Sequence, residues 1–189
     1  YGVDVEPGRV IVTAGSSAAF LLGFLAAFGD GARIGLTEPG YPAYRNIVSA
    51  LGMEAVGTPT EASTRYQPTP ELLDRAGVLD GLVIASPANP TGTMLDRDAL
   101  IGLVVWARER GVQIISDEVY HGISYGAAAV TVAGLTTEAI IVNSFSKYFA
   151  MTGWRLGWMV APPELVRSVE RLAQNLFISP PALAQHAAL

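Results

Sequence analysis

Residues 96–117 read DRDALIGLVVWARERGVQIISD, and this stretch decides the fold. Asp96 has a side chain that caps helices and Gly111 is a stop signal, so a helix is predicted over Arg97–Arg110. The β-branched run Val112–Ser116 follows at once and predicts a strand. A helix that leads directly into an apolar strand is the repeating unit of a parallel sheet.

The same alternation of strands and helices extends over the whole chain. Helices are predicted at Ala18–Phe28, at Glu71–Ala76 and from Pro163 to about Phe177, while Thr58–Pro70 is predicted to be a surface loop. We therefore expect an α/β fold, a three-layer sandwich with a mostly parallel seven-stranded sheet and helices on both faces. The other six strands are predicted at Val10–Thr13, Arg33–Thr37, Glu54–Gly57, Leu82–Ala85, Ile140–Asn143 and Leu156–Val160.

Composition narrows the class of function. The chain has 189 residues, half of them hydrophobic, which predicts one large domain with a sheet covered on both sides. The longest apolar run is shorter than the ~20 residues that a membrane helix needs. A net charge of −5 without a basic stripe argues against nucleic-acid binding.

Cysteine is absent and histidine occurs twice, so neither a disulfide framework nor a His/Cys metal site is predicted. No secretory signal is visible at the start of the sequence. These features favour small-molecule chemistry in a reducing cytoplasm.

Ligands of open α/β sheets bind beyond the carboxyl ends of the strands, so the residues that follow each strand are the candidates for chemistry. This rule selects five polar or turn-forming segments before any family is considered. They are Gly15–Ser17, Glu38–Tyr41, Ser86–Gly92, Asp117–Tyr120 and Ser144–Lys147.

Lys147 is the only lysine, against eleven arginines, and it follows a predicted strand directly. A lysine amine can lose its proton and attack an aldehyde, whereas a guanidinium stays protonated. Lys147 is therefore the candidate for covalent chemistry. The alternative is a solvated surface lysine.

Asp117, Tyr120 and Asn89 are candidates for holding an aromatic cofactor ring. A buried carboxylate at Asp117 could keep a pyridine nitrogen protonated, or it could cap a turn. The Tyr120 hydroxyl and the Asn89 amide could both reach a phenolic oxygen of the same ring. Ordinary roles in packing and in the turn Asn89–Gly92 are the alternatives.

Gly15, Ser16 and Ser17 lie where the first strand becomes a helix, and free backbone N–H groups at such a place favour a phosphate. Arg155 can add a permanently charged partner, with Ser144 and Ser146 as hydroxyl donors. The alternatives are a capped helix and a surface ion pair. Tyr41 could stack on a planar ring or pack in the core.

In their order along the chain, these motifs resemble the class I/II aminotransferases, which are fold-type I pyridoxal-phosphate enzymes. The resemblance covers nearly the whole chain. It rests on Gly15–Ser17, Glu38–Tyr44, Asn89–Gly92, Asp117–Tyr120, Ser144–Lys147 and Gly153–Gly157.

The resemblance implies a role for each site residue. Lys147 corresponds to the Schiff-base lysine, Asp117 to the partner of the pyridine nitrogen, and Tyr120 with Asn89 to the pair at the ring hydroxyl. Tyr41 corresponds to the stacking aromatic residue. The phosphate ligands correspond to Ser16, Ser17, Ser144 and Arg155, with Ser146 as an addition.

The resemblance also implies a reaction, transamination between an amino acid and a 2-keto acid with ping-pong kinetics. It implies that residues 1–189 form the cofactor-binding large domain of a homodimeric enzyme, without the N-terminal segment and the C-terminal small domain of the family.

Three alternatives stay open at this stage. A fold-type I lyase would use the same cofactor for β-elimination or decarboxylation. An aminotransferase-like effector domain of a transcription regulator would be non-catalytic. A nicotinamide-binding domain would use Gly15 and Glu38, but the glycine-rich GxGxxG pattern lacks its second glycine here.

Overall fold

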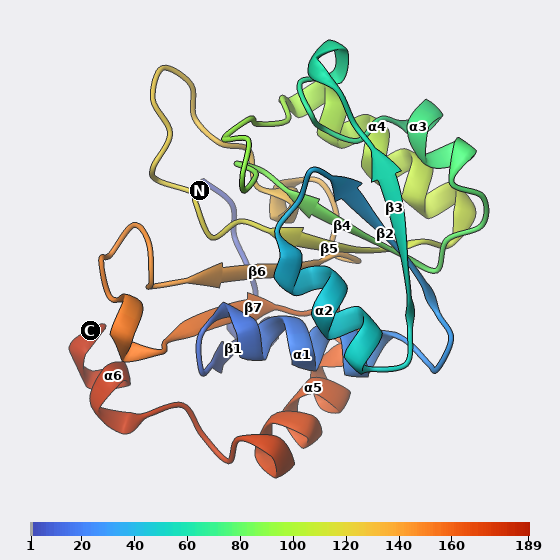
Figure 1. Cartoon of the computed structure of the whole chain (residues 1–189). Helices are drawn as coiled ribbons and strands as arrows, with labels where there is room; N and C mark the ends of the chain where they lie inside the picture. The colour runs from blue at the N-terminus through green and yellow to red at the C-terminus, as the bar shows by residue number, and fades with distance from the viewer. Residues whose placement is uncertain (1) are drawn as a thin grey trace.

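A seven-stranded sheet forms the centre of the protein, as the computed structural model of the chain shows for residues 2–189 (Figure 1). The strand order is β1-β7-β6-β5-β4-β2-β3. Neighbouring strands are parallel except where β7 pairs antiparallel with β1 and with β6. The strands are β1 (Val10–Thr13), β2 (Arg33–Glu38), β3 (Glu54–Pro59), β4 (Gly81–Ala85), β5 (Gln113–Asp117), β6 (Ile140–Ser144) and β7 (Gly157–Val160).

Helices cover both faces of this sheet (Figure 1), which confirms the predicted three-layer sandwich. One face packs against α1 (Ser16–Ala27), α2 (Pro42–Ala50) and α5 (Pro163–Leu176), and the other packs against α3 (Pro70–Arg75) and α4 (Arg97–Arg110). Successive residues of the central strands alternate between the two cores. Ile115 packs on the α1 side and Ile114 on the α4 side, because side chains alternate across a strand.

Two helices were not predicted from the sequence. In α2, Pro42 occupies the first turn, where its missing N–H costs nothing, and the short segment lacks the polar cap that reveals α4. The other is α6 (Ala182–Ala187), which begins after Pro181 and has a single fully buried residue, Ala184. Short helices of this kind are fixed by their surroundings more than by sequence.

The predicted surface loop Thr58–Pro70 is wrong in its inner part. Thr58, Thr60 and Gln67 are buried, and β3 continues to Pro59. The Gln67 amide donates to the backbone oxygen of Thr93 at 2.9 Å, and more weakly to that of Ala85 at 3.3 Å. A polar side chain can be buried where it satisfies backbone groups, and composition alone does not reveal such partners.

The start of α1 also differs from the prediction. Ser16 is the first helical residue, and Gly15 precedes it with φ +81° and no side-chain cap. The hydroxyls at this helix start therefore remain available for other partners.

The direction of β7 brings distant segments to one edge of the sheet. Thr13 at the end of β1 and Ser144 at the end of β6 both pair with Gly157, the first residue of β7. Residues that precede β7 therefore lie at the same rim as residues that follow β1 and β6. Arg155, Ser16 and Lys147 meet there for this reason.

The cap of α4 gives a test of the local structure. The Asp96 carboxylate accepts a hydrogen bond from the Ala99 backbone N–H at 2.9 Å. We expect Asp96→Ala to lower the free energy of unfolding by about 1 kcal/mol in urea unfolding. Asp98→Ala, an exposed change in the same turn, is the control, with an expected loss of a few tenths of a kcal/mol. Equal losses in the two variants would contradict the cap.

Candidate functional site

A cavity of about 180 Å³ lies at the rim where β1, β5, β6 and β7 bring their polar ends together. All the site residues predicted from the sequence line it except Ser144. The polar lining residues are Ser16, Ser17, Tyr41, Tyr44, Asn89, Asp117, Tyr120, Ser146, Lys147, Thr152 and Arg155. A single amine, a buried carboxylate and a guanidinium therefore share one cavity.

Lys147 lies in the turn that follows β6, and its side chain is exposed at the cavity. The ammonium nitrogen is 5.8 Å from the centre of the Tyr120 ring. Exposure alone would fit a surface lysine, but Lys147 lines the same cavity as Asp117 and Arg155. Its position agrees with the prediction of a reactive amine at the rim.

Two serines fix the backbone of this turn. The Ser144 hydroxyl accepts from the Ser146 N–H at 3.1 Å and donates to the Ser146 hydroxyl at 2.8 Å. The Thr152 hydroxyl donates to the Ser146 carbonyl at 2.7 Å. Ser144 is 1% exposed and its hydroxyl bonds within the turn, while Ser146 lines the cavity.

Asp117 is the buried anionic group of the site. One carboxylate oxygen accepts from the Val119 N–H at 3.0 Å, and the other accepts from the Tyr44 hydroxyl. Burial raises the pKa of Asp117, and these two hydrogen bonds oppose the rise. The carboxylate is thus positioned by two donors while its remaining surface faces the cavity.

Tyr44 is a site residue that the sequence analysis did not single out. Burial, followed by the charge of Asp117, raises the pKa of Tyr44 well above its ordinary value, so its hydroxyl stays a donor. Tyr44 lies one helical turn after Tyr41, and the two rings meet edge to face with their centres 5.5 Å apart. That spacing in a helix at the rim is the signal that could have revealed it.

Asn89 and Tyr120 approach each other across the cavity. The Asn89 amide nitrogen is 3.5 Å from the Tyr120 hydroxyl, a long hydrogen bond that leaves room for a shared ligand atom. Burial and the charge of Asp117 raise the pKa of Tyr120, and Asn89 opposes this. Tyr41 keeps 43% of its surface exposed, so its ring is available beside the cavity.

Close packing of glycines with Arg155 forms a cradle at the start of α1. A side-chain carbon at Gly15 would lie 2.6 Å from an Arg155 guanidinium nitrogen, and one at Gly157 would lie 3.1 Å from the Ser16 backbone nitrogen. Arg155 has φ +52° and donates to the Thr152 carbonyl at 3.1 Å. Helix N–H groups, two hydroxyls and a guanidinium are the donor set that binds a phosphate group.

The site therefore fits a pyridine ring that carries an aldehyde, a hydroxyl and a phosphate. The phosphate matches the cradle, the ring nitrogen matches Asp117, and the aldehyde matches the only lysine of the chain. Among residues 2–189, no cluster of acidic, histidine or cysteine side chains could hold a metal ion.

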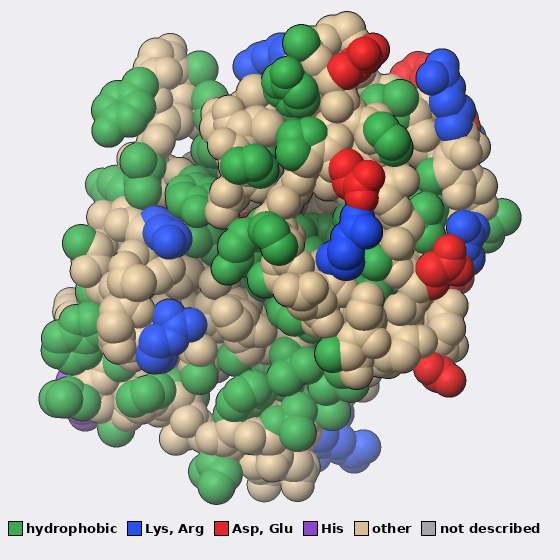
Figure 2. Space-filling model, in the orientation of Figure 1, with side chains coloured by type: hydrophobic (Ala, Val, Ile, Leu, Met, Phe, Trp, Pro, Cys, Tyr) green, Lys and Arg blue, Asp and Glu red, His purple; other side chains and the backbone are tan. Residues whose placement is uncertain are grey.

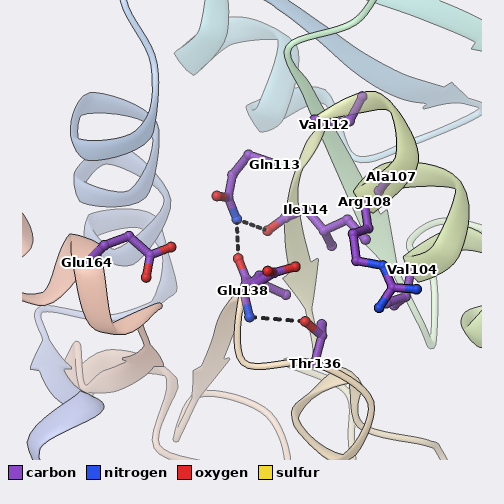
Figure 3. Close-up of a pocket in the computed structure, with 11 residues that line it drawn as sticks. Val104, Ala107, Arg108, Val112, Gln113, Ile114, Thr136, Glu138 and Glu164 are labelled. Atoms are coloured by element: carbon purple, nitrogen blue, oxygen red, sulfur yellow. Dashed lines mark hydrogen bonds between the residues drawn. The ribbon is translucent and has the colours of Figure 1, made fainter.

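A larger cavity, of about 270 Å³, lies at the opposite edge of the sheet near the start of β5 (Figure 3). The Gln113 amide there donates to the carbonyls of Ile114 and Glu138. The polar groups that this cavity exposes are thus partly satisfied by one another, and it contains neither Lys147 nor Asp117. The residues predicted to carry chemistry line the other cavity, at the carboxyl ends of the parallel strands.

Charged side chains on the face shown in Figure 2 are dispersed and form no continuous basic stripe. Glu38, the residue that a nicotinamide site would require, pairs instead with Arg45 on α2. Its carboxylate also occupies the space beside Gly57. This arrangement disfavours the nicotinamide alternative.

Comparison with known proteins gives a family. The model of the family "Aminotransferase class I and II" matches residues 1–189. The valine–pyruvate aminotransferase of Mycobacterium tuberculosis is 50% identical over 100% of this chain and 50% of that protein. The (5-formylfuran-3-yl)methyl phosphate transaminase of Methanocaldococcus jannaschii is 34% identical over 100% of the chain and 49% of that protein.

Solved structures give the same result. A crystal structure of a putative aminotransferase from Silicibacter pomeroyi has a TM-score of 0.96 at 55% identity, over 100% of this chain and 50% of that one. Aspartate aminotransferase from Thermus thermophilus with maleate has a TM-score of 0.92 at 31% identity, over 99% and 50%. The chain spans about half the length of the curated relatives it matches.

Glu118, next to Asp117, predicts a pH dependence of stability. Burial raises the pKa of its carboxyl from 4.5 to about 7, so between these values the folded state holds a proton that the unfolded state has lost. The stability that this proton gives is fully present below pH 4.5 and is lost as the pH rises to about 7. We expect the urea midpoint to fall over this range.

Glu118→Gln, whose side chain is neutral at every pH, should reduce that fall. Glu170→Gln, at an exposed position of α5, is the matched control and should leave this fall unchanged. A Glu118→Gln protein with the full pH dependence of the parent would show that Glu118 is not the group responsible.

Proposed function

Since this chain belongs to the aminotransferase class I and II family, we propose that it is the cofactor-binding domain of an enzyme that transfers an amino group between an amino acid and a 2-keto acid. One observation carries the proposal: Lys147, Asp117 and Arg155 come from three segments and line one cavity. The relatives that match the chain are named as transaminases, which favours transfer over lyase chemistry or a non-catalytic effector domain.

Members of this family depend on pyridoxal phosphate. This cofactor supplies an aldehyde that condenses with amines and a ring that accepts electrons. In the proposal, Lys147 holds it covalently. Ser16, Ser17, Ser144 and Arg155 hold the phosphate, and Ser146 at the cavity is a further candidate. Tyr41 lies against the ring, and Asn89 with Tyr120 contacts the ring hydroxyl.

Asp117 keeps the proton on the ring nitrogen, because a buried carboxylate with two protein donors stays close to the cationic ring and favours its charged form. Lys147, when its amine is free, takes the proton from the α-carbon of the substrate and returns it as general acid. The position of Lys147 in a turn fixed by Ser144 and Thr152 gives its nitrogen a defined reach over the cavity.

We further propose that residues 1–189 are the large domain of a longer, homodimeric cytoplasmic protein. The coverage of about half of each relative supports the greater length of the protein, and the segment that binds the substrate carboxylate would then lie outside residues 1–189. Among the described helices, none is both long and apolar enough to cross a membrane. The 50% identity to a valine–pyruvate aminotransferase makes valine and pyruvate the first substrate pair to test.

Borohydride reduction tests the covalent role of Lys147. Reduction of the full-length protein loaded with pyridoxal phosphate should add the cofactor mass to the peptide that contains Lys147. Lys147→Arg keeps the positive charge but cannot form the bond, so it should take up no mass and lose roughly 10²–10⁴-fold in kcat. Labelling at another residue, or equal labelling of Lys147→Arg, would overturn the assignment.

Steady-state kinetics tests transfer against elimination. If Lys147 serves both halves of a transfer, the amino acid must leave as a keto acid before the second substrate binds, and double-reciprocal plots should be parallel. Detection of the keto acid product without release of ammonia completes the test. Intersecting lines, or ammonia in place of an aminated second product, would contradict transamination.

A further inference from the structure

A buried polar pair lies directly behind the wall of the cavity. Glu118 follows Asp117 and His121 follows Tyr120, and the pair is 2% and 4% exposed. The turn after β5 therefore presents Asp117 and Tyr120 to the cavity, and Glu118 with His121 to the protein interior. The proposed function uses only the first two.

Polar contacts connect this pair to Val132, the first residue of a short 3-10 helix, and to the end of β4. One Glu118 carboxyl oxygen accepts from the Val132 N–H at 2.8 Å, and the other lies 3.4 Å from Nδ1 of His121. Nε2 of His121 lies 2.9 Å from the carbonyl oxygen of Ser86, the first residue after β4. The pair thus connects the end of β5 to the segment that carries Asn89.

The chemistry of the partners fixes which atoms carry protons. A carbonyl oxygen only accepts, so Nε2 of His121 is the protonated nitrogen. Nδ1 of the neutral ring is then unprotonated, and it lies 3.4 Å from a carboxyl oxygen of Glu118. Burial raises the pKa of Glu118 to about 7 and lowers that of His121, and both directions favour this neutral form, which is less costly to bury than two charges.

The link bears on the two side chains at the proposed ring hydroxyl. Asn89 is three residues after Ser86, and Tyr120 is adjacent to His121 in the chain. Their polar atoms are 3.5 Å apart at the cavity. Movement of the Ser86 carbonyl relative to the His121 ring would change this separation, because each partner is part of the short segment that carries one of the two side chains.

We propose that His121, oriented by Glu118, is a positioning residue that sets the separation of Asn89 and Tyr120 through the Ser86 carbonyl. The inference rests on the proposed function, in which these two side chains donate to the ring hydroxyl oxygen of the cofactor. Two donors withdraw negative charge from that oxygen, so the neighbouring Lys147 nitrogen, when bonded to the cofactor, holds its own proton less tightly.

The test is a pH titration of the absorbance of bound pyridoxal phosphate in the full-length protein. His121→Leu removes the donor to Ser86, and the midpoint should rise by about one pH unit, a tenfold gain in proton affinity, as expected for one misaligned hydrogen bond. His121→Asn should give the same rise, since its amide is too short to replace Nε2. His121→Gln places an amide N–H near the position of Nε2 and should restore the original midpoint.

His186→Gln on exposed α6 is the control and should leave the midpoint unchanged. A His121→Leu protein that binds the cofactor, unfolds at a lower temperature and keeps the parental midpoint would overturn the inference, as would a His121→Gln protein that shifts as far as His121→Leu. If neither His121→Leu nor His121→Asn folds, His121 serves stability alone and the inference is wrong.

The titration of the parent protein distinguishes failure of the positioning role of His121 from failure of the proposed function. If the parent binds no pyridoxal phosphate and shows no absorbance change, the proposed function itself fails. If the parent titrates normally and only the His121 variants fail to shift, the proposed function stands and the positioning role is rejected.

Discussion

The site depends on the antiparallel entry of β7 at Gly157. Because Thr13 and Ser144 both pair with this residue, the start of α1, the approach of Arg155 and the turn of Lys147 must converge on one point of the rim. A side chain at Gly157 would lie 2.8 Å from the Asn143 carbonyl oxygen and 3.1 Å from the Ser16 nitrogen, so only glycine allows the three segments to close together. The sheet topology and the close packing at Gly157 thus allow Arg155, the start of α1 and Lys147 to contact one ligand.

The site also depends on how the buried carboxylate of Asp117 is stabilised. A carboxylate in the interior is costly unless donors compensate it, and Tyr44 and the Val119 N–H provide that compensation from one side. The open side faces the cavity, so a cationic ring nitrogen would complete the set of partners. Behind the same turn, burial raises the pKa of Glu118 and lowers that of His121, so both residues are favoured in their neutral forms, which cost less to bury than an ion pair.

Much of this arrangement could be predicted from the sequence because the signals were local. The Asp96 cap and the Gly111 stop gave α4 its exact bounds, and the rule that ligands bind at strand ends selected the segments that line the cavity. Lys147 could be selected because it is the only lysine in the sequence. The comparisons confirmed the family that the motifs resemble.

What could not be predicted depends on contacts between distant segments. Gln67 is buried because it reaches Thr93, and Tyr44 matters because α2 brings it to Asp117. The contact of His121 with Ser86 spans 35 residues and leaves no pattern in the sequence. None of these residues has a neighbour in the chain that reveals its partner, so only the folded structure assigns them.

A crystal structure of the full-length protein grown with pyridoxal phosphate tests the central claim most directly. We expect continuous electron density from the Lys147 side-chain nitrogen into the cofactor, with the ring nitrogen at Asp117 and the phosphate between the start of α1 and Arg155. Cofactor density at any other place, such as the cavity beside Gln113 and Glu138, or a ring nitrogen directed away from Asp117, would contradict it.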